Sequence, residues 1–324
     1  MDFLIYELVS DDFKLNVRTS DSNKFAISIG RAYHDSDSKT YNLNFDIGLF
    51  RLIYDALYIV LSNNTFFKGI GFSDGQFKIP TIEVPNWAAL DMAIGNNDLV
   101  YFDEERVELH KFLYTLCLHF IARHEVRHIA NGHIDYLAGT GRKLFFENAK
   151  NGLSCLDSQT LEMDVDSCVC AGLVNGFLNI SKTKEFIPKT LHSIEGMFYS
   201  LLFALKMLFF CLPSKKISSL AEAQISSHPN SSMRYFFSFT AGLSFIQEYH
   251  PDLADTFGII YQSSWTDFNE LEKQGLLKVD KVISDYEWTM SDEGFEYMGK
   301  VWNNWNNWIP KLKPFAYLEL APEN

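Results

Sequence analysis

Hydrophobic and polar positions divide the chain into an N-terminal part with the short period of β-strands and a longer part with the period of helices. Short apolar runs separated by Asp- and Ser-rich segments predict a small antiparallel sheet. These runs cover residues 3–9, 13–18, 25–29 and 41–45. Residues 46–62 then repeat apolar positions with helical spacing. Residues 66–85 contain several glycines and prolines, which predicts strands joined by turns.

The rest of the chain carries mainly helical patterns. We expect helices near residues 86–95, 107–135, 158–178, 190–212, 230–250 and 292–308, and long loops at 136–157 and 213–227. The fold class that follows is α+β, a mainly α-helical region (86–324) preceded by a β-rich N-terminal region (1–85). Because no linker rich in Pro, Gly or Ser separates the two regions, we expect one continuous globular unit.

The longest predicted helix contains an H-E-x-x-H motif, His124-Glu125-Val126-Arg127-His128. On a helix, residues four apart share a face, so His124 and His128 can bind one zinc ion. Glu125 points in a neighbouring direction and can act as general base toward a water at the metal. An apolar stripe upstream predicts a buried, rigid helix, which a metal site needs. The five residues alone would also fit an exposed, salt-bridged helix with two ordinary histidines.

A zinc site requires a third protein ligand, and two candidates follow the motif. His133 lies about 140° around an ideal helix from His128, so we interpret it as structural. Glu162 opens the next predicted helix; Asp166 shares its face, whereas Asp164 points nearly opposite. Glu162 would complete a two-His, one-Glu site, and Asp166 would accept a hydrogen bond from the outer nitrogen of a ligand histidine. Without the upstream motif, these acidic residues would be explained by the helix dipole.

A third polar element is the sequence His228-Pro229-Asn230-Ser231-Ser232-Met233-Arg234. The proline suits a loop or the first turn of a helix. His228 could contact a developing oxyanion, and Arg234 could hold the site or the substrate backbone. The alternative is a turn with a solvated histidine.

The order of these elements resembles the gluzincin metallopeptidases of the HtpX and CAAX-prenyl-protease type, which carry H-E-x-x-H, then E-x-x-x-D, then H-P-x-x-x-x-R. The resemblance covers residues 107–250 and implies a gluzincin-like helical catalytic core. The chain departs from the usual motifs at Arg127, where glycine is common, and at Val165, where alanine is usual. The β-rich N-terminal layout also resembles the Lit-type phage-exclusion peptidases of bacteria, which cleave elongation factor Tu inside infected cells.

This resemblance assigns a role to each motif residue. It implies zinc as the cofactor, with His124, His128 and Glu162 as ligands and Glu125 as the catalytic base. It places Asp166 behind a ligand histidine, and His228 and Arg234 among the catalytic residues.

Composition and charge restrict the partners and the compartment. The 324-residue chain has a net charge of −13 and no dense Lys/Arg run, which disfavours nucleic acid and leaves a protein or peptide substrate. Five cysteines without a framework spacing indicate a reducing compartment, and the N-terminus does not resemble a signal peptide, so we expect a cytoplasmic protein. The oligomeric state is not indicated by any pattern.

Two apolar features near the C-terminal half have ordinary explanations. Residues 197–212 are shorter than the ~20 residues of a membrane span and contain Lys206, so we expect a buried helix and no stable membrane insertion. Trp302, Trp305 and Trp308 recur every three residues, which predicts a helix face packed on the core. Stacking of these rings on single-stranded bases is disfavoured by the negative charge.

The sequence thus predicts a zinc-dependent endopeptidase acting on an intracellular protein, and the resemblance to Lit-type peptidases implies a role in phage exclusion. Two alternatives stay open. One is a non-catalytic, zinc-stabilised module that binds a protein, and the other is a membrane-associated protease that uses residues 197–212 as a span.

Overall fold

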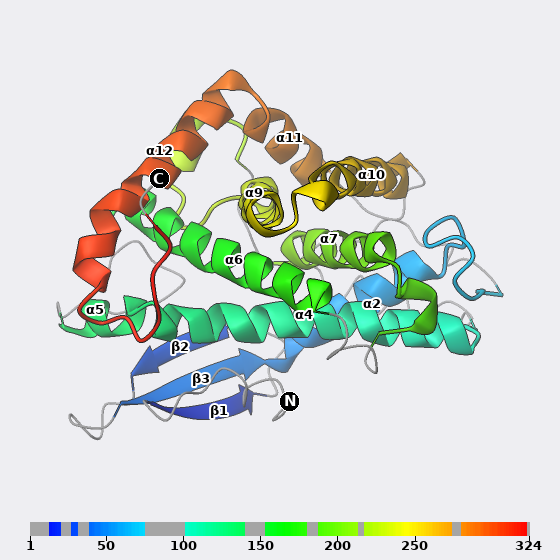
Figure 1. Cartoon of the computed structure of the whole chain (residues 1–324), viewed down its shortest axis with the longest axis horizontal. Helices are drawn as coiled ribbons and strands as arrows, with labels where there is room; N and C mark the ends of the chain where they lie inside the picture. The colour runs from blue at the N-terminus through cyan, green and yellow to red at the C-terminus, as the bar shows by residue number, and fades with distance from the viewer. Residues whose placement is uncertain are drawn as a thin grey trace.

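The computed structural model is mainly helical, with a small sheet below one long helix (Figure 1). It describes residues 13–20, 27–31, 39–74, 101–139, 153–179, 187–212, 217–273 and 280–322. The predicted strand at 3–9 and the predicted helix at 86–95 lie outside the described residues.

The sheet has three strands, β1 (Lys14–Ser20), β2 (Ile27–Arg31) and β3 (Thr40–Asp46), in the order β1-β3-β2. The central strand β3 pairs antiparallel with β2 but parallel with β1. The expectation of an antiparallel sheet is therefore wrong for the β1–β3 pair, because β1 crosses to the far side of β3 instead of pairing with its neighbour in sequence. Alternate residues of β3, namely Tyr41, Leu43 and Phe45, are buried and join the main core.

Helix α2 (Ile47–Leu61) follows β3 directly and packs against α4 (Glu104–Ala130). The side chain of Asp103 caps α4 by accepting a hydrogen bond from the Arg106 backbone N–H at 2.9 Å. The buried Arg106 guanidinium donates to backbone carbonyls between Leu61 and Ile70, which fixes the turns after α2. Strands were predicted from residue 66 onward, but residues 66–74 form turns and bends with one isolated bridge, Ser73 to Phe102; residues 75–85 lie outside the described part.

The predicted single helix 107–135 is two helices in the structure. Helix α4 ends at Ala130, and α5 (His133–Gly139) starts three residues later. Asn131 caps α4, and Gly132 has a φ of +79°, the left-handed conformation that favours glycine at a helix end. The prediction missed this Asn-Gly stop signal and placed the end of the helix at later glycines.

The other helices form a layer above α4 in Figure 1. The predictions for 158–178, 190–212, 230–250 and 292–308 correspond to α6 (Cys155–Leu178), α7 (Ile194–Cys211), α9 (Ser231–Tyr249) and α12 (Asp292–Leu312). Helix α6 begins at Ser154 as its cap, earlier than predicted. The prediction did not include α8 (Leu220–Gln224), α10 (Ala254–Lys273) and α11 (Asp280–Thr289), nor the short helices η4 (Lys189–Leu191) and η5 (Pro251–Leu253).

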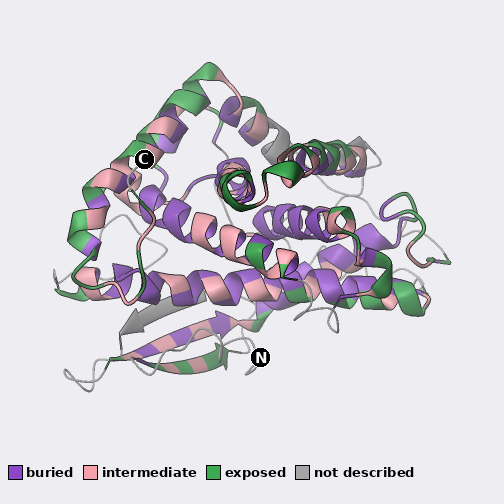
Figure 2. Cartoon of the chain, in the orientation of Figure 1, coloured by how far each residue is buried: buried purple, intermediate pink, exposed green. Residues whose placement is uncertain are grey.

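The core lies between α4 and this upper layer, where Figure 2 shows the buried faces of α4, α6 and α7 turned inward. Helix α6 packs on α4, α9 and α12, so it lies at the centre of the helical assembly. The tryptophan stripe of α12 packs as predicted: Trp305 and Trp308 are buried, and Trp308 Nε1 donates to Asp157 Oδ1 on α6 at 2.9 Å.

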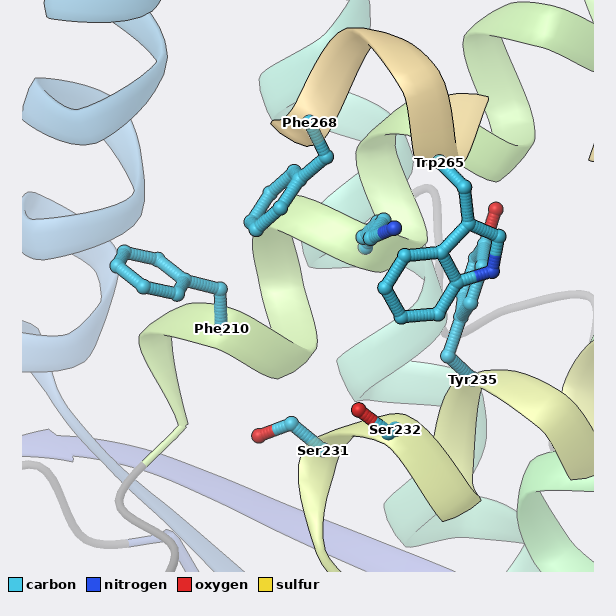
Figure 3. A pocket seen from close by; sticks show the side chains of 7 residues that line it. Phe210, Ser231, Ser232, Tyr235, Trp265 and Phe268 are labelled. Carbon is cyan, nitrogen blue, oxygen red and sulfur yellow. The ribbon is translucent and has the colours of Figure 1, made fainter. Parts of the chain in front are cut away.

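Helix α7 is long and apolar enough to cross a membrane by length and composition alone, and most of it is buried by the protein itself. Its Lys206 is also buried, at 4% exposure. This side chain shares a small cavity with α9 and α10 residues, of which Figure 3 shows Tyr235, Trp265 and Phe268. A helix that is covered by the rest of the protein over most of its length is typical of a protein core.

Candidate metal centre

Two neighbouring helices contribute the side chains of a buried polar cluster. Helix α4 presents His124 and His128 toward α6, α6 presents Glu162 and Asp166 toward α4, and Glu125 is buried next to His124. All five residues are at most 5% exposed. The apolar stripe upstream of the motif buries α4 as predicted, and the i, i+4 spacing puts each pair on one helical face.

His124, His128 and Glu162 form a triad that could hold a metal ion. The Nε2 atoms of the two histidines lie 3.2 Å apart. Glu162 Oε2 lies 3.4 Å from His124 Nε2, and Glu162 Oε1 lies 3.6 Å from His128 Nε2. Bonds of about 2.0–2.1 Å at a tetrahedral ion place neighbouring ligand atoms roughly 3.3 Å apart. The triad therefore has the spacing that a small tetrahedral ion requires, and the residues present fit such an ion.

The outer nitrogen of His124 contacts a carboxylate that is itself anchored. Asp166 Oδ1 lies 2.9 Å from His124 Nδ1. Arg234 of α9 donates from Nε to Asp166 Oδ2 and from a terminal nitrogen to Oδ1, each at 2.7 Å. The same guanidinium is 3.7 Å from Glu162. Arg234 thus holds Asp166 in place, and Asp166 orients His124.

The outer nitrogen of His128 contacts a second histidine. His133 Nδ1 lies 2.9 Å from His128 Nδ1, although the sequence argument placed His133 on the opposite face. On one straight helix His133 would face away from His128, but the turn at Gly132 brings His133 back beside the motif. His133 Nε2 in turn lies 3.2 Å from Asp164 Oδ2, without the alignment of a good hydrogen bond.

Asp164 is the second residue near the site that the sequence argument missed. It is 3% exposed, and its Oδ2 accepts a hydrogen bond from Asn131 Nδ2 at 2.6 Å. It points away from Glu162 around α6, as the periodicity predicts, but it points toward the α4–α5 turn and not toward solvent. The signal that could have revealed it is the helix stop at Asn131-Gly132, because that stop returns the chain toward α6.

The charges of the cluster are strongly coupled. Burial favours the neutral imidazole of His124, but the Asp166 and Glu162 carboxylates outweigh burial and raise the pKa of His124 to about 10. Burial also opposes ionisation of Glu162, yet the two nearby histidines hold the pKa of Glu162 well below its usual range. Burial lowers the pKa of His128. The carboxylates therefore stabilise a positive charge among the atoms of the triad, and either a proton or a metal cation can supply it.

Glu125 differs from the other members of the cluster. Burial raises the pKa of Glu125 to about 7, and Glu162 adds to this shift while His124 opposes it. Its Oε2 is buried and has no hydrogen-bond partner among the described residues. A buried carboxylate oxygen without a partner can accept a hydrogen bond from a small molecule, such as water, at the site.

His228 lies just before α9, close enough to interact electrostatically with Glu162, Arg234 and His124. Burial lowers the pKa of His228, so the imidazole is biased toward its neutral form. Its Nδ1 is 3.0 Å from Ser227 Oγ. The side chain of His228 is half-buried, so it keeps some contact with solvent. Asn230, two residues later, caps α9 through Met233 N–H.

The structure brings the three predicted motifs into one cluster, and it adds His133, Asp164 and Asn131 to their surroundings. No protein-family model matches the chain, and comparisons with curated proteins and with solved structures find no match either. The functional interpretation of the chain therefore depends on the chemistry of its buried triad.

Proposed function

We propose that the chain is a zinc-dependent endopeptidase that hydrolyses a peptide bond in a protein substrate. The observation that supports this most is the convergence of His124 Nε2, His128 Nε2 and the Glu162 carboxylate at tetrahedral ligand spacing. Glu125, adjacent to His124, adds an unpartnered carboxylate oxygen. Three protein ligands leave a fourth position open, which is typical of catalytic zinc sites and not of structural ones.

The ligand set favours a transition metal such as zinc over Ca²⁺ and Mg²⁺. Ca²⁺ and Mg²⁺ prefer oxygen ligands, and two imidazoles with one carboxylate provide mainly nitrogen. The short separations also suit four-coordinate geometry better than the larger shells of Ca²⁺. Zinc at this site would supply Lewis acidity toward a substrate carbonyl and toward water.

The chain's own residues would carry the proton and orient the reactants. Glu125 would accept a proton from the attacking water at its free oxygen and return a proton to the leaving amine. Arg234 would act through Asp166, which holds the imidazole of His124. His228 would donate a hydrogen bond to the carbonyl oxygen that becomes negatively charged.

The cellular setting is part of the same proposal. All five cysteines are free thiols, which supports a reducing compartment and hence a cytoplasmic substrate. The resemblance to Lit-type peptidases is the ground for proposing phage exclusion as the biological role.

The first test is metal content, measured by elemental mass spectrometry on purified protein. We expect about one zinc per chain. Glu162→Ala should lose zinc or bind it far more weakly. Glu248→Ala removes an exposed carboxylate of α9 and is the matched control, so it should keep its zinc. A wild-type protein that binds no zinc, even after zinc is added, would refute the proposal.

The second test is cleavage of unidentified substrates. Zinc-loaded wild type and Glu125→Gln are each incubated with a bacterial lysate, and new protein N-termini are profiled by mass spectrometry. We expect new N-termini with the wild type and a loss of ~10²–10⁴-fold in their rate of formation with Glu125→Gln, because a positioned general base contributes this much. The variant should retain zinc. A zinc-loaded wild type that generates no new N-termini would favour the non-catalytic module.

A further inference from the structure

Each ligand histidine of the triad has one nitrogen toward the metal position and the other toward a buried partner. For His124 the outer partner is a carboxylate, Asp166, at 2.9 Å. For His128 the outer partner is another imidazole, that of His133, also at 2.9 Å. The two ligands are therefore supported differently, and the second support is the one that no sequence motif assigned.

The contact between His128 and His133 is possible in only some proton arrangements. A histidine that binds a metal through Nε2 carries its proton on Nδ1 and needs an acceptor there. His133 Nδ1 can accept only when it is unprotonated, so the neutral His133 ring must carry its proton on Nε2. That Nε2 lies 3.2 Å from Asp164 Oδ2, and the carboxylate attracts this proton electrostatically although the two atoms are not aligned as a hydrogen bond.

Asp164 is placed for this role by the turn that separates α4 from α5. Its Oδ2 accepts from Asn131 Nδ2 at 2.6 Å, so the turn and the carboxylate are joined. The turn itself is closed by the C-terminal segment, where the backbone N–H groups of Tyr317 and Leu318 donate to Ala130 O at 2.8 and 3.3 Å. Both His133 and Asp164 are almost fully buried, at 0% and 3% exposure. Such enclosure leaves their relative orientation little freedom.

We propose that His133 and Asp164 are positioning residues for the metal ligand His128. Asp164 fixes the proton of His133 on Nε2, and His133 then accepts the Nδ1 proton of His128 and directs His128 Nε2 at the metal. The inference rests on the proposed function only in taking the triad as a metal site, and it assigns neither residue a contact with metal or substrate.

The test measures the dissociation constant of zinc by competition with a chromophoric chelator at one pH. His133→Leu removes the acceptor and should weaken zinc binding by about 10–100-fold, the usual effect of losing such a supporting group. His133→Gln keeps an acceptor and a donor on one planar group and should recover most of the affinity. His110→Leu is the matched control, a buried histidine of α4 whose Nε2 contacts Tyr54 O at 2.9 Å, and it should bind zinc like the wild type.

Asp164→Asn distinguishes positioning from simple packing. The amide can keep an oxygen toward Asn131 Nδ2 and His133 Nε2 but loses the negative charge that holds the His133 proton there, so zinc binding should weaken although little volume changes. The double variant His133→Leu/Asp164→Asn should be no weaker than His133→Leu, because both act through one path. The Co²⁺-substituted proteins provide a second readout: the visible spectrum should change in His133→Leu and resemble the wild type in His133→Gln.

The outcomes separate this inference from the proposed function. Unchanged zinc affinity in folded His133→Leu, equal losses in His133→Gln, or additive losses in the double variant would each overturn the positioning role. Zinc binding with these expected effects but without proteolysis would refute the peptidase and support the positioning role. A wild-type protein without zinc affinity would overturn both.

Discussion

Lys206 is a buried amine whose surroundings are mainly aromatic. Its Nζ lies over the rings of Trp265, Tyr235 and Phe268 and has no hydrogen-bond partner within the described part of the chain. Burial lowers the pKa of Lys206 well below its ordinary value. The aromatic faces attract an ammonium, but they do not replace the hydration that the charged form loses.

The depressed pKa of Lys206 makes folding stability depend on pH. Between its pKa in the fold and its ordinary pKa of ~10.4, the unfolded chain binds more protons than the folded chain. The free energy of unfolding should therefore rise with pH in that window, by at most about 1.4 kcal/mol per pH unit from this group. We expect the difference between wild type and Lys206→Met, measured by urea denaturation from pH 7 to 10, to follow this rise.

The methionine variant should also be the more stable protein at pH 7, by about 1–3 kcal/mol, because it removes an unpartnered buried amine at similar volume. Lys300→Met replaces an exposed lysine that pairs with Glu296 and serves as the control. Parallel curves for wild type and Lys206→Met across the pH range would show that Lys206 has an ordinary pKa in the fold.

At the candidate site, periodicity and motif order predicted the residues that share a helix face. His124, His128 and Glu162 converge because each lies on a regular helix, where i, i+4 spacing determines direction. His133 and Asp164 could not be placed in the same way. Their contact depends on the non-helical turn at Gly132, which redirects the chain just before His133, and helical spacing does not encode such a turn.

At the scale of elements, the α4–α5 turn joins the metal helix to the C-terminal segment. Gly132 has a φ of +79°, and a Cβ at this position would lie 2.6 Å from the carbonyl carbon of Phe315. The turn therefore requires glycine both for its backbone conformation and for the close approach of residues 315–316. Residues 315–318 therefore pack against the C-terminal end of α4 and bond to it.

Gly132→Ala should therefore destabilise the protein and loosen the metal site. The left-handed conformation alone costs about 1–2 kcal/mol for a residue with a Cβ, and displacement of Phe315 adds to it. Gly176→Ala is the control, because a Cβ at this position of α6 meets nothing within 4 Å. Within a helix, alanine is more stable than glycine by ~0.5–1 kcal/mol. Urea denaturation should give opposite signs for the two variants. Equal stabilities for Gly132→Ala and wild type would mean that the turn adapts to a side chain.

Local patterns predicted most of the long helices but neither α10 nor the pairing of the strands. Helix α6, whose residues are mostly buried, and helix α9 lie within a few residues of their predicted bounds. Helix α10 buries one face, formed by Phe257, Tyr261, Phe268 and Leu271. The prediction missed this helix because polar residues separate these mainly aromatic positions. The parallel β1–β3 pair joins strands that are not neighbours in sequence, so no hairpin signal could reveal it.

The metal position connects segments that are distant in the chain. Ligands come from α4 and α6, and Arg234 attaches α9 to the same cluster through Asp166. Bound zinc should therefore stabilise the folded molecule as a whole. An ion that binds only the folded state adds about 2.7 kcal/mol when its free concentration is 100-fold above its dissociation constant. We expect calorimetry to show an increase of a few degrees in Tm when zinc is added to metal-free wild type.

Glu162→Ala is the control that assigns this stabilisation to the triad. The variant lacks one ligand but retains both histidines, so added zinc should raise its Tm far less than that of the wild type. The metal-free variant carries one buried carboxylate fewer, and its own Tm gives the baseline for the comparison. The same zinc-dependent increase in both proteins would place the bound ion elsewhere in the chain, because a stabilisation that does not depend on Glu162 cannot arise from the α4–α6 junction.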